Sequence, residues 1–137
     1  MPGGNMNRKG HAKILAVDDE KNFLQLLSHT LQKEGYAVKT ALDGQEALKR
    51  LEQEQFDVAL IDIRMTPIDG LAVLGDIKRR YPYTKVIMIT AYPSVETRSL
   101  SLQRGAERYL IKPIEIQELK ETIREMLSHL DKDYPKD

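Results

Sequence analysis

The chain has 137 residues, enough for one domain with its own core, and its 21 basic residues balance its 21 acidic ones. A net charge of zero gives no electrostatic reason to expect the domain itself to bind nucleic acid or an anionic membrane. There is no cysteine, and no apolar stretch approaches the roughly 20 residues that a membrane span needs, so we expect a cytoplasmic protein without disulfides or cysteine-bound metals.

The first half of the chain predicts three strands and two helices. An apolar run over 13–17 predicts a strand, and apolar residues at helical spacing then continue until Gly35, a typical helix stop. A weaker strand over 36–41 leads to a helix that Asp43 caps. The run from Val58 to Asp62 is apolar without alternation, which indicates a strand buried on both faces, as in parallel sheets.

The second half repeats this alternation of helix and strand. Its predicted elements are a helix that ends before Pro82, a strand over 85–90, a helix from Ser94 to Gly105, a strand over 108–112, and a last helix with an apolar stripe that reaches Leu130. Five strands alternating with five helices predict an α/β fold, a parallel sheet with helices on both faces. Right-handed crossovers leave few topologies for it.

Four of the five predicted strands end in polar residues. All carboxyl-terminal ends of a parallel sheet lie along one edge, where ligands bind in open α/β sheets. We therefore expect these residues to converge although dozens of positions separate them in the chain. They are Asp18 and Asp19 after the first strand, Asp62 on the third, Thr90 on the fourth and Lys112 on the fifth.

Three carboxylates that meet at one edge repel one another. A single pair 4 Å apart costs about 4 kcal/mol at an effective dielectric constant near 20. A divalent cation would compensate, and oxygen donors without histidine or cysteine favour Mg²⁺ over zinc. A cation, the ammonium of Lys112, the hydroxyl of Thr90 and a carboxylate at a strand tip together resemble a phosphoryl-transfer site in which the carboxylate is the nucleophile.

Four segments, each weak alone, carry a resemblance to the receiver domain of two-component response regulators when taken in order. The resemblance covers about residues 11 to 130 and implies the doubly wound, flavodoxin-like (βα)5 fold of the chemotaxis regulators, with strand order 2-1-3-4-5. It makes 12–130 the receiver domain, 1–11 a flexible arm and 131–137 a tail or the start of a linker. The segments are Ile14-Leu15-Ala16-Val17-Asp18-Asp19-Glu20, Asp62-Ile63-Arg64-Met65 with Asp69-Gly70, Ile87-Met88-Ile89-Thr90-Ala91, and Gly105-Ala106 with Tyr109-Leu110-Ile111-Lys112-Pro113-Ile114.

The resemblance implies a role for each residue at the predicted edge. Asp62 is the phospho-acceptor, charged by a sensor histidine kinase or a phosphotransfer protein. Asp19 and Asp62 bind Mg²⁺ or Mn²⁺ directly, Asp18 assists through water, and the backbone carbonyl of Arg64 is the third protein ligand. Lys112 pairs with the phosphoryl group.

Further residues are implied to transmit the signal. Thr90 and Tyr109 form the switch pair, and the peptide bond from Lys112 to Pro113 is expected to be cis. Phosphorylation is expected to change the face made by the fourth helix, the fifth strand and the fifth helix, which binds an output partner or forms a homodimer. The resemblance implies a signalling domain rather than an enzyme.

The sequence departs from the family pattern after the acceptor. Thr66 stands four residues past Asp62, where the family usually has proline, and Pro67 follows it. Arg64 and Tyr92 each lie two residues past a site residue, at positions that tune hydrolysis in the family. We predict that these bulky side chains hinder the attacking water and lengthen the phosphoryl lifetime.

Several other functions are weighed against this one. A Mg²⁺-dependent aspartyl phosphatase of the haloacid dehalogenase type needs an acid two residues past its nucleophile, where this chain has Arg64. A flavodoxin-like cofactor site would not place acids after the first strand, because they repel an anionic ligand. A receiver that signals by binding alone would not need the complete set of site residues. The domain is either free-standing or part of a longer regulator, often a transcription factor.

Overall fold

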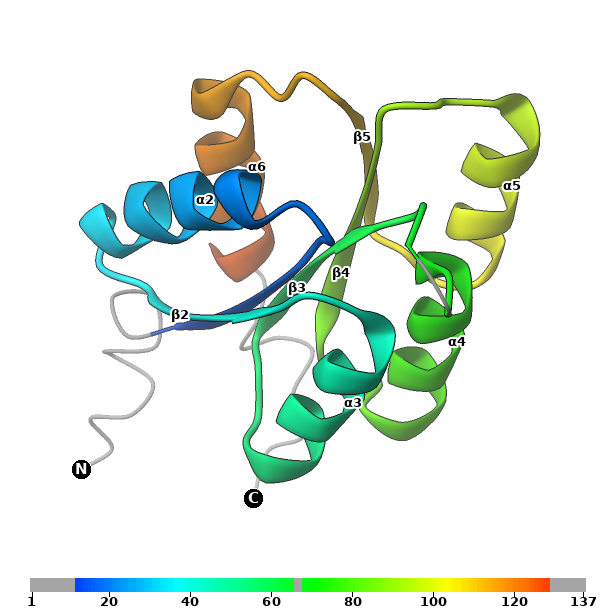
Figure 1. The fold of residues 1–137 in the computed structure, drawn as a ribbon, viewed down its shortest axis with the longest axis horizontal. Coiled ribbons are helices and arrows are strands. Elements are labelled where there is room, and N and C mark those ends of the chain that lie inside the picture. The colour runs from blue at the N-terminus through cyan, green and yellow to red at the C-terminus, as the bar shows by residue number, and fades with distance from the viewer. Residues whose placement is uncertain (1–11, 66–67, 129–137) are drawn as a thin grey trace.

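The computed structural model describes residues 12–65 and 68–128, and in this part of the chain five strands alternate with five helices (Figure 1). The alternation and the five predicted strands are confirmed. The elements are β1 (Lys13–Val17), α2 (Lys21–Lys33), β2 (Ala37–Ala41), α3 (Gly44–Gln53), β3 (Val58–Asp62), α4 (Gly70–Arg80), β4 (Lys85–Thr90), α5 (Val95–Gln103), β5 (Arg108–Ile111) and α6 (Ile116–Ser128).

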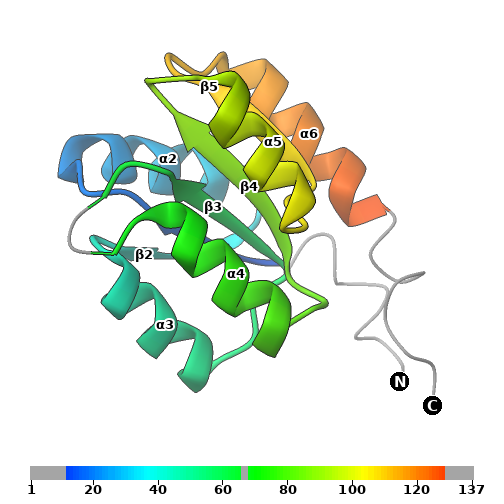
Figure 2. The ribbon, with the colours of Figure 1, turned by 90° about the vertical axis from the view of Figure 1, so that its right-hand side faces the viewer.

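The five strands form one parallel sheet in the order β2-β1-β3-β4-β5, as the resemblance implied. Helices α2 and α6 cover one face of this sheet, and α3, α4 and α5 cover the other (Figures 1 and 2). Because every strand runs in the same direction, the ends of β1, β3, β4 and β5 meet along one edge of the sheet.

The core consists of two apolar layers, one on each face of the sheet. All five residues of β3 are buried, as its uninterrupted apolar run predicted. Alternate residues of each central strand point to opposite layers, which holds the strand ends rigidly in place. The layer under α3, α4 and α5 includes Leu15, Val17, Ala59, Ile61, Val73, Leu74, Ile77, Val86 and Met88; the layer under α2 and α6 includes Ile14, Ala16, Leu24, Leu27, Leu31, Leu60, Ile87, Ile89, Leu119 and Ile123.

The predicted helix boundaries have clear local causes. The side chains of Asp43 and Ser94 accept hydrogen bonds from backbone N–H groups in the first turns of α3 and α5, at 2.8 and 3.0 Å. Gly35 and Gly105 follow α2 and α5 with φ of 97° and 104°, a conformation that glycine adopts without strain. Strand β5 ends at Ile111, one residue earlier than predicted.

Some sequence predictions fall outside the described residues. They are the arm over 1–11, the tail over 131–137, the domain end at 130, and the loop positions Thr66 and Pro67. Across the described ranges, none of the helices has both the length and the apolar character that crossing a bilayer requires.

The loop after Asp62 returns to the strand through Gly70, the first residue of α4. The backbone N–H of Gly70 donates to the carbonyl of Ile63 at 2.8 Å. A Cβ atom at position 70 would overlap the carbonyl oxygen of Asp62 and lie 2.9 Å from Cα of Ile63. The absence of a side chain at Gly70 therefore lets α4 begin directly against the residue that carries the central carboxylate.

We predict that Gly70→Ala destabilises the fold by about 2–4 kcal/mol, because a rigid backbone atom must move to admit the new methyl group. Gly75→Ala in the same helix is the matched control. Position 75 has open space around it, so there the substitution should be neutral or stabilise by up to about 1 kcal/mol. Urea unfolding of both variants checks this, and equal unfolding midpoints would contradict the tight approach at Gly70.

Candidate functional site

Three carboxylates meet at the carboxyl-terminal edge of the sheet. Asp18 and Asp19 follow β1 directly, and Asp62 is the last residue of β3. The pairing of Val17 with Ile61 brings these two strand ends side by side. One carboxylate oxygen from each aspartate lies within 4.8 Å of the others. Asp18 and Asp62 are buried, with 2% and 6% of their surface exposed, whereas Asp19 is exposed.

Lys112 brings a positive charge to these carboxylates. Its Nζ donates to Oδ2 of Asp18 at 2.7 Å and lies 3.9 Å from Oδ2 of Asp62. Its backbone N–H donates to the carbonyl of Thr90 at 2.8 Å, and the bond to Pro113 is cis. Burial lowers the pKa of the Lys112 ammonium, but the hydrogen bond to Asp18 and the nearby carboxylates outweigh burial and raise that pKa overall. The ammonium therefore stays charged at neutral pH.

The Asp62 carboxyl is the group that the crowding affects most. Burial and the negative charge of Asp18 raise the pKa of Asp62 to about 6. The charge of Lys112 and a hydrogen bond from the backbone N–H of Arg64 act in the opposite direction, but they do not offset burial. The charge of Lys112 is thus too small to keep the pKa of the buried Asp62 carboxyl at its ordinary value.

The donor set fits a hard divalent cation. The cluster consists of three aspartates, so every side-chain donor is an oxygen. Asp19 is exposed to solvent, whereas the other two are buried. Mg²⁺ suits such a site, because it takes few protein oxygens and keeps several waters. A cation here would also supply the charge that Lys112 alone does not.

The hydroxyl groups of Thr90 and Tyr109 both accept hydrogen bonds from the loop between β4 and α5. Thr90 is the last residue of β4, is buried, and accepts a hydrogen bond from the backbone N–H of Tyr92 at 3.0 Å. The hydroxyl of Tyr109 lies at the start of α5. It is 2.7 Å from the hydroxyl of Thr97 and accepts from the backbone N–H of Ser94 at 3.3 Å.

An open cavity of about 400 Å³ adjoins the acids, with Asp19, Arg64 and Thr97 among its lining residues. At this end of the sheet the side chains of Arg64 and Tyr92 stack on each other. The guanidinium carbon of Arg64 lies 4.5 Å from the centroid of the Tyr92 ring, and both side chains are exposed. Such cation–π contacts hold two long side chains in one place.

Sequence reasoning missed two residues that contact the site or its hydroxyl groups. The ammonium of Lys112 lies 4.5 Å from the ring centroid of Phe23, which is in the first turn of α2. Phe23 follows Asp19 by about one helical turn, and this spacing was a signal that could have found it. The contact of Thr97 with Tyr109 depends on how α5 packs on β5, which no local pattern shows.

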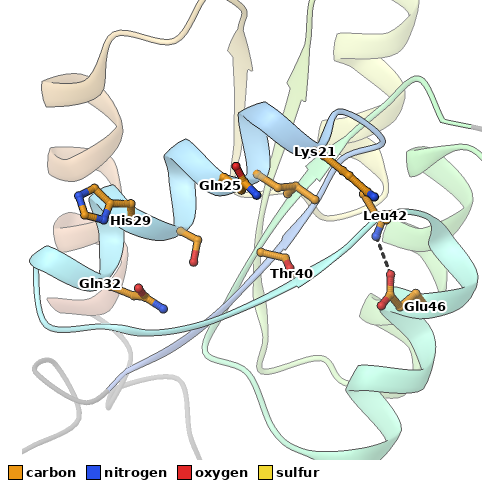
Figure 3. A pocket seen from close by; sticks show the side chains of 9 residues that line it. Lys21, Gln25, His29, Gln32, Thr40, Leu42 and Glu46 are labelled. Carbon is orange, nitrogen blue, oxygen red and sulfur yellow. Dashed lines mark hydrogen bonds between the residues drawn. The ribbon is translucent and has the colours of Figure 1, made fainter.

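A second recess, of about 470 Å³, lies between α2, β2 and the start of α3 (Figure 3). Lys21 and His29 of α2 and Thr40 of β2 are among its lining residues, and Glu46 accepts the backbone N–H of Leu42 at 2.7 Å. Within residues 12–65 and 68–128, only the three aspartates form a group of acids or histidines close enough to share an ion. The acidic edge is therefore the better candidate site.

Comparisons with known proteins show which family the chain is similar to. Residues 14–124 match the family described as the response regulator receiver domain. The transcriptional regulatory protein ZraR of Salmonella typhimurium is 39% identical over 121 residues, which are 88% of this chain and 27% of that protein. The alkaline phosphatase synthesis transcriptional regulatory protein PhoP of Bacillus subtilis is 35% identical over 84% of this chain and 48% of its own length. The chain thus spans about a quarter to a half of these relatives.

Solved structures give the same likeness. A CheY-like response regulator receiver domain protein from Methanospirillum hungatei superposes with a TM-score of 0.88 at 35% identity, covering 90% of this chain and 99% of that one. The response regulator TrrA of Thermotoga maritima, in complex with Mg²⁺ and beryllofluoride, has a TM-score of 0.77 at 38% identity and covers 84% and 98%.

We predict that Asp62→Asn stabilises the metal-free protein in a pH-dependent way. The pKa of Asp62 is about 6 in the folded state and near 4 in the unfolded chain. Ionised Asp62 therefore destabilises the fold, by an amount that grows between pH 4 and pH 6 and is complete above pH 6. The gain should be about 1–3 kcal/mol at pH 8, decline through pH 6 and nearly vanish at pH 4. Chemical unfolding in the presence of a chelator measures it.

Asp19→Asn is the control for that experiment. Asp19 belongs to the same cluster but is exposed, so its substitution should give a smaller gain. A difference between wild type and Asp62→Asn that stays constant from pH 4 to pH 8 would contradict the strain assigned to Asp62.

Proposed function

The chain belongs to the family of response regulator receiver domains, and we propose that its Asp62 accepts a phosphoryl group from a phosphohistidine of a sensor kinase or phosphotransfer protein. The observation that carries this proposal is the meeting of Asp18, Asp19, Asp62 and Lys112 at one strand edge. An oxygen of Asp62 attacks phosphorus, a P–O bond forms, and the P–N bond breaks with its electron pair left on the imidazole nitrogen.

Asp19 and Asp62 bind Mg²⁺ or Mn²⁺ directly in this proposal. Asp18 assists through water, and the backbone carbonyl of Arg64 is the third protein ligand. When bound, the cation neutralises negative charge on the phosphoryl oxygens. The all-oxygen cluster and the raised pKa of Asp62 support this assignment, as does the Thermotoga maritima relative that is in complex with Mg²⁺ and beryllofluoride.

Lys112 and Thr90 stabilise the phosphoryl group itself. The Lys112 ammonium, 3.9 Å from the Asp62 carboxylate, is close enough to pair with a phosphoryl oxygen after a small movement. Thr90 accepts the N–H of Tyr92, which leaves its own proton to donate. A charge-assisted hydrogen bond of this kind contributes roughly 1.5–3 kcal/mol.

The signal leaves through the face formed by α5, β5 and α6. Phosphorylation adds roughly −1.5 to −2 charge, so Thr90 is drawn toward Asp62 and Tyr109 turns into the space that it leaves. The hydroxyl bonds of Tyr109 to Ser94 and Thr97 couple such a turn to the start of α5. The change is a shift between two packings of one face.

Exposed apolar side chains on this face support its use as a contact surface. Val95 is 83% exposed and Ile111 is 51% exposed, although both are apolar. The partner is an output domain, a target protein or a second copy of the chain. Because the relatives ZraR and PhoP are transcriptional regulatory proteins, we infer a cytoplasmic regulator in which residues 12–130 form the receiver and 131–137 are a tail or the start of a linker. This domain itself is a signalling domain with no role in contacting DNA.

Phosphorylation by a small-molecule donor tests the proposal. Wild-type protein incubated with acetyl phosphate and Mg²⁺ should gain one phosphoryl group by intact mass, and a chelator should abolish the gain. Asp62→Asn should remain unmodified, because an amide oxygen cannot take the phosphoryl group. Modification of Asp62→Asn to the wild-type extent would assign the acceptor elsewhere, and an unmodified wild type would contradict the proposed function.

We also predict that the stack of Arg64 on Tyr92 lengthens the phosphoryl lifetime, because it hinders water near Asp62. Replacing both residues with alanine should speed loss of the phosphoryl group about three- to tenfold, equal to roughly 1 kcal/mol of barrier. Tyr83→Ala is the matched control. Tyr83 is also exposed, but it lies just before β4, at the amino-terminal ends of the strands and therefore away from Asp62. An unchanged or slower loss in the double variant would disprove the role of the stack.

A further inference from the structure

Phe23 forms one wall of the space that holds the Lys112 ammonium. The centroid of its ring lies 4.5 Å from Nζ of Lys112, within the range of a cation–π contact. The ring is half-buried and packs against the apolar layer under α2 and α6, so its position is fixed by the core. The function proposed above assigns no role to this contact.

The carboxylates form the other walls. Oδ2 of Asp18 accepts from Lys112 at 2.7 Å, and Oδ2 of Asp62 lies 3.9 Å away. Oδ1 of Asp18 accepts the backbone N–H of Glu20 at 2.9 Å, which ties that carboxylate to the start of α2. Phe23 lies in the first turn of the same helix. The start of α2 thus positions the ammonium through two contacts. One is the hydrogen bond to Asp18, whose carboxylate is bound to the backbone of Glu20, and the other is the cation–π contact with Phe23.

A lysine has a flexible stem, so its ammonium stays beside Asp62 only if other positions are less favourable. One such position lies toward Glu20, an exposed carboxylate that attracts Lys112 electrostatically. An aromatic face attracts the ammonium but accepts none of its protons as a carboxylate does, so those protons remain directed at Asp18 and Asp62. A purely apolar side chain in place of Phe23 would fill the space without this attraction.

We propose that Phe23 is a positioning residue for phosphoryl binding, whose ring face holds Lys112 where it meets the phosphoryl group on Asp62. The inference rests on the proposed function, because it assigns a further residue to the same site. It differs from a packing role for Phe23, in which any apolar side chain of similar size would serve.

Binding of beryllofluoride in the presence of Mg²⁺ tests the inference, with the affinity of Mg²⁺ alone as a second measurement. Phe23→Leu and Phe23→Met keep an apolar side chain but remove the ring, whereas Phe23→Tyr keeps the ring. We expect the first two variants to bind beryllofluoride about three- to thirtyfold more weakly than wild type, and Phe23→Tyr to bind within about twofold of it. Mg²⁺ alone should bind all four proteins without loss of affinity, because the ring contacts Lys112, which has the same sign of charge as the cation.

Three results would overturn the inference. Wild-type affinity for beryllofluoride in both Phe23→Leu and Phe23→Met would show that the ring face has no role. An equal loss in Phe23→Tyr would show that shape matters rather than the ring. A parallel loss of Mg²⁺ affinity would indicate a general collapse of the site. A wild-type protein that does not bind beryllofluoride would instead overturn the proposed function, and the inference with it.

Discussion

Two buried carboxylates and a third exposed one are held together at the edge of a rigid sheet, where burial and their mutual repulsion both disfavour the ionised form of Asp62. The parallel ladder fixes where β1 and β3 end, so Asp18 and Asp62 cannot move apart without disturbing the core. Burial, and after it the charge of Asp18, raises the pKa of Asp62 to about 6, although the ammonium of Lys112 acts in the opposite direction. A site in this condition favours whatever brings positive charge, whether a bound cation or the ammonium already in place.

Several backbone contacts hold these charged residues in place at the strand ends. Gly70 lets α4 start against the backbone of Asp62, and the backbone of Lys112 is bound to the end of β4. The Tyr109 hydroxyl joins β5 to the first turn of α5. These contacts join the ends of β3, β4 and β5 to the first turn of α5.

Much of this architecture was predictable from the sequence because its causes are local. The uninterrupted apolar run of β3, the caps at Asp43 and Ser94, and the glycine stops each act within a few residues. The strand order and the meeting of acids with Lys112 followed from the parallel topology and from the family resemblance.

The contacts that sequence reasoning missed depend on side-chain packing between elements. The ring of Phe23 contacts Lys112 from a different part of the chain, and its spacing from Asp19 hints at a place near the site without showing which group it contacts. The contact of Thr97 with Tyr109 depends on how α5 packs on β5, which no local pattern shows. The most direct measurement of the central claim is a crystal structure with Mg²⁺ and beryllofluoride. The account predicts fluoroberyllate on Asp62, within hydrogen-bond distance of Lys112 Nζ and Thr90 Oγ1, with Mg²⁺ on Asp19. Beryllofluoride bound away from Asp62, or Mg²⁺ away from the acids, would contradict it.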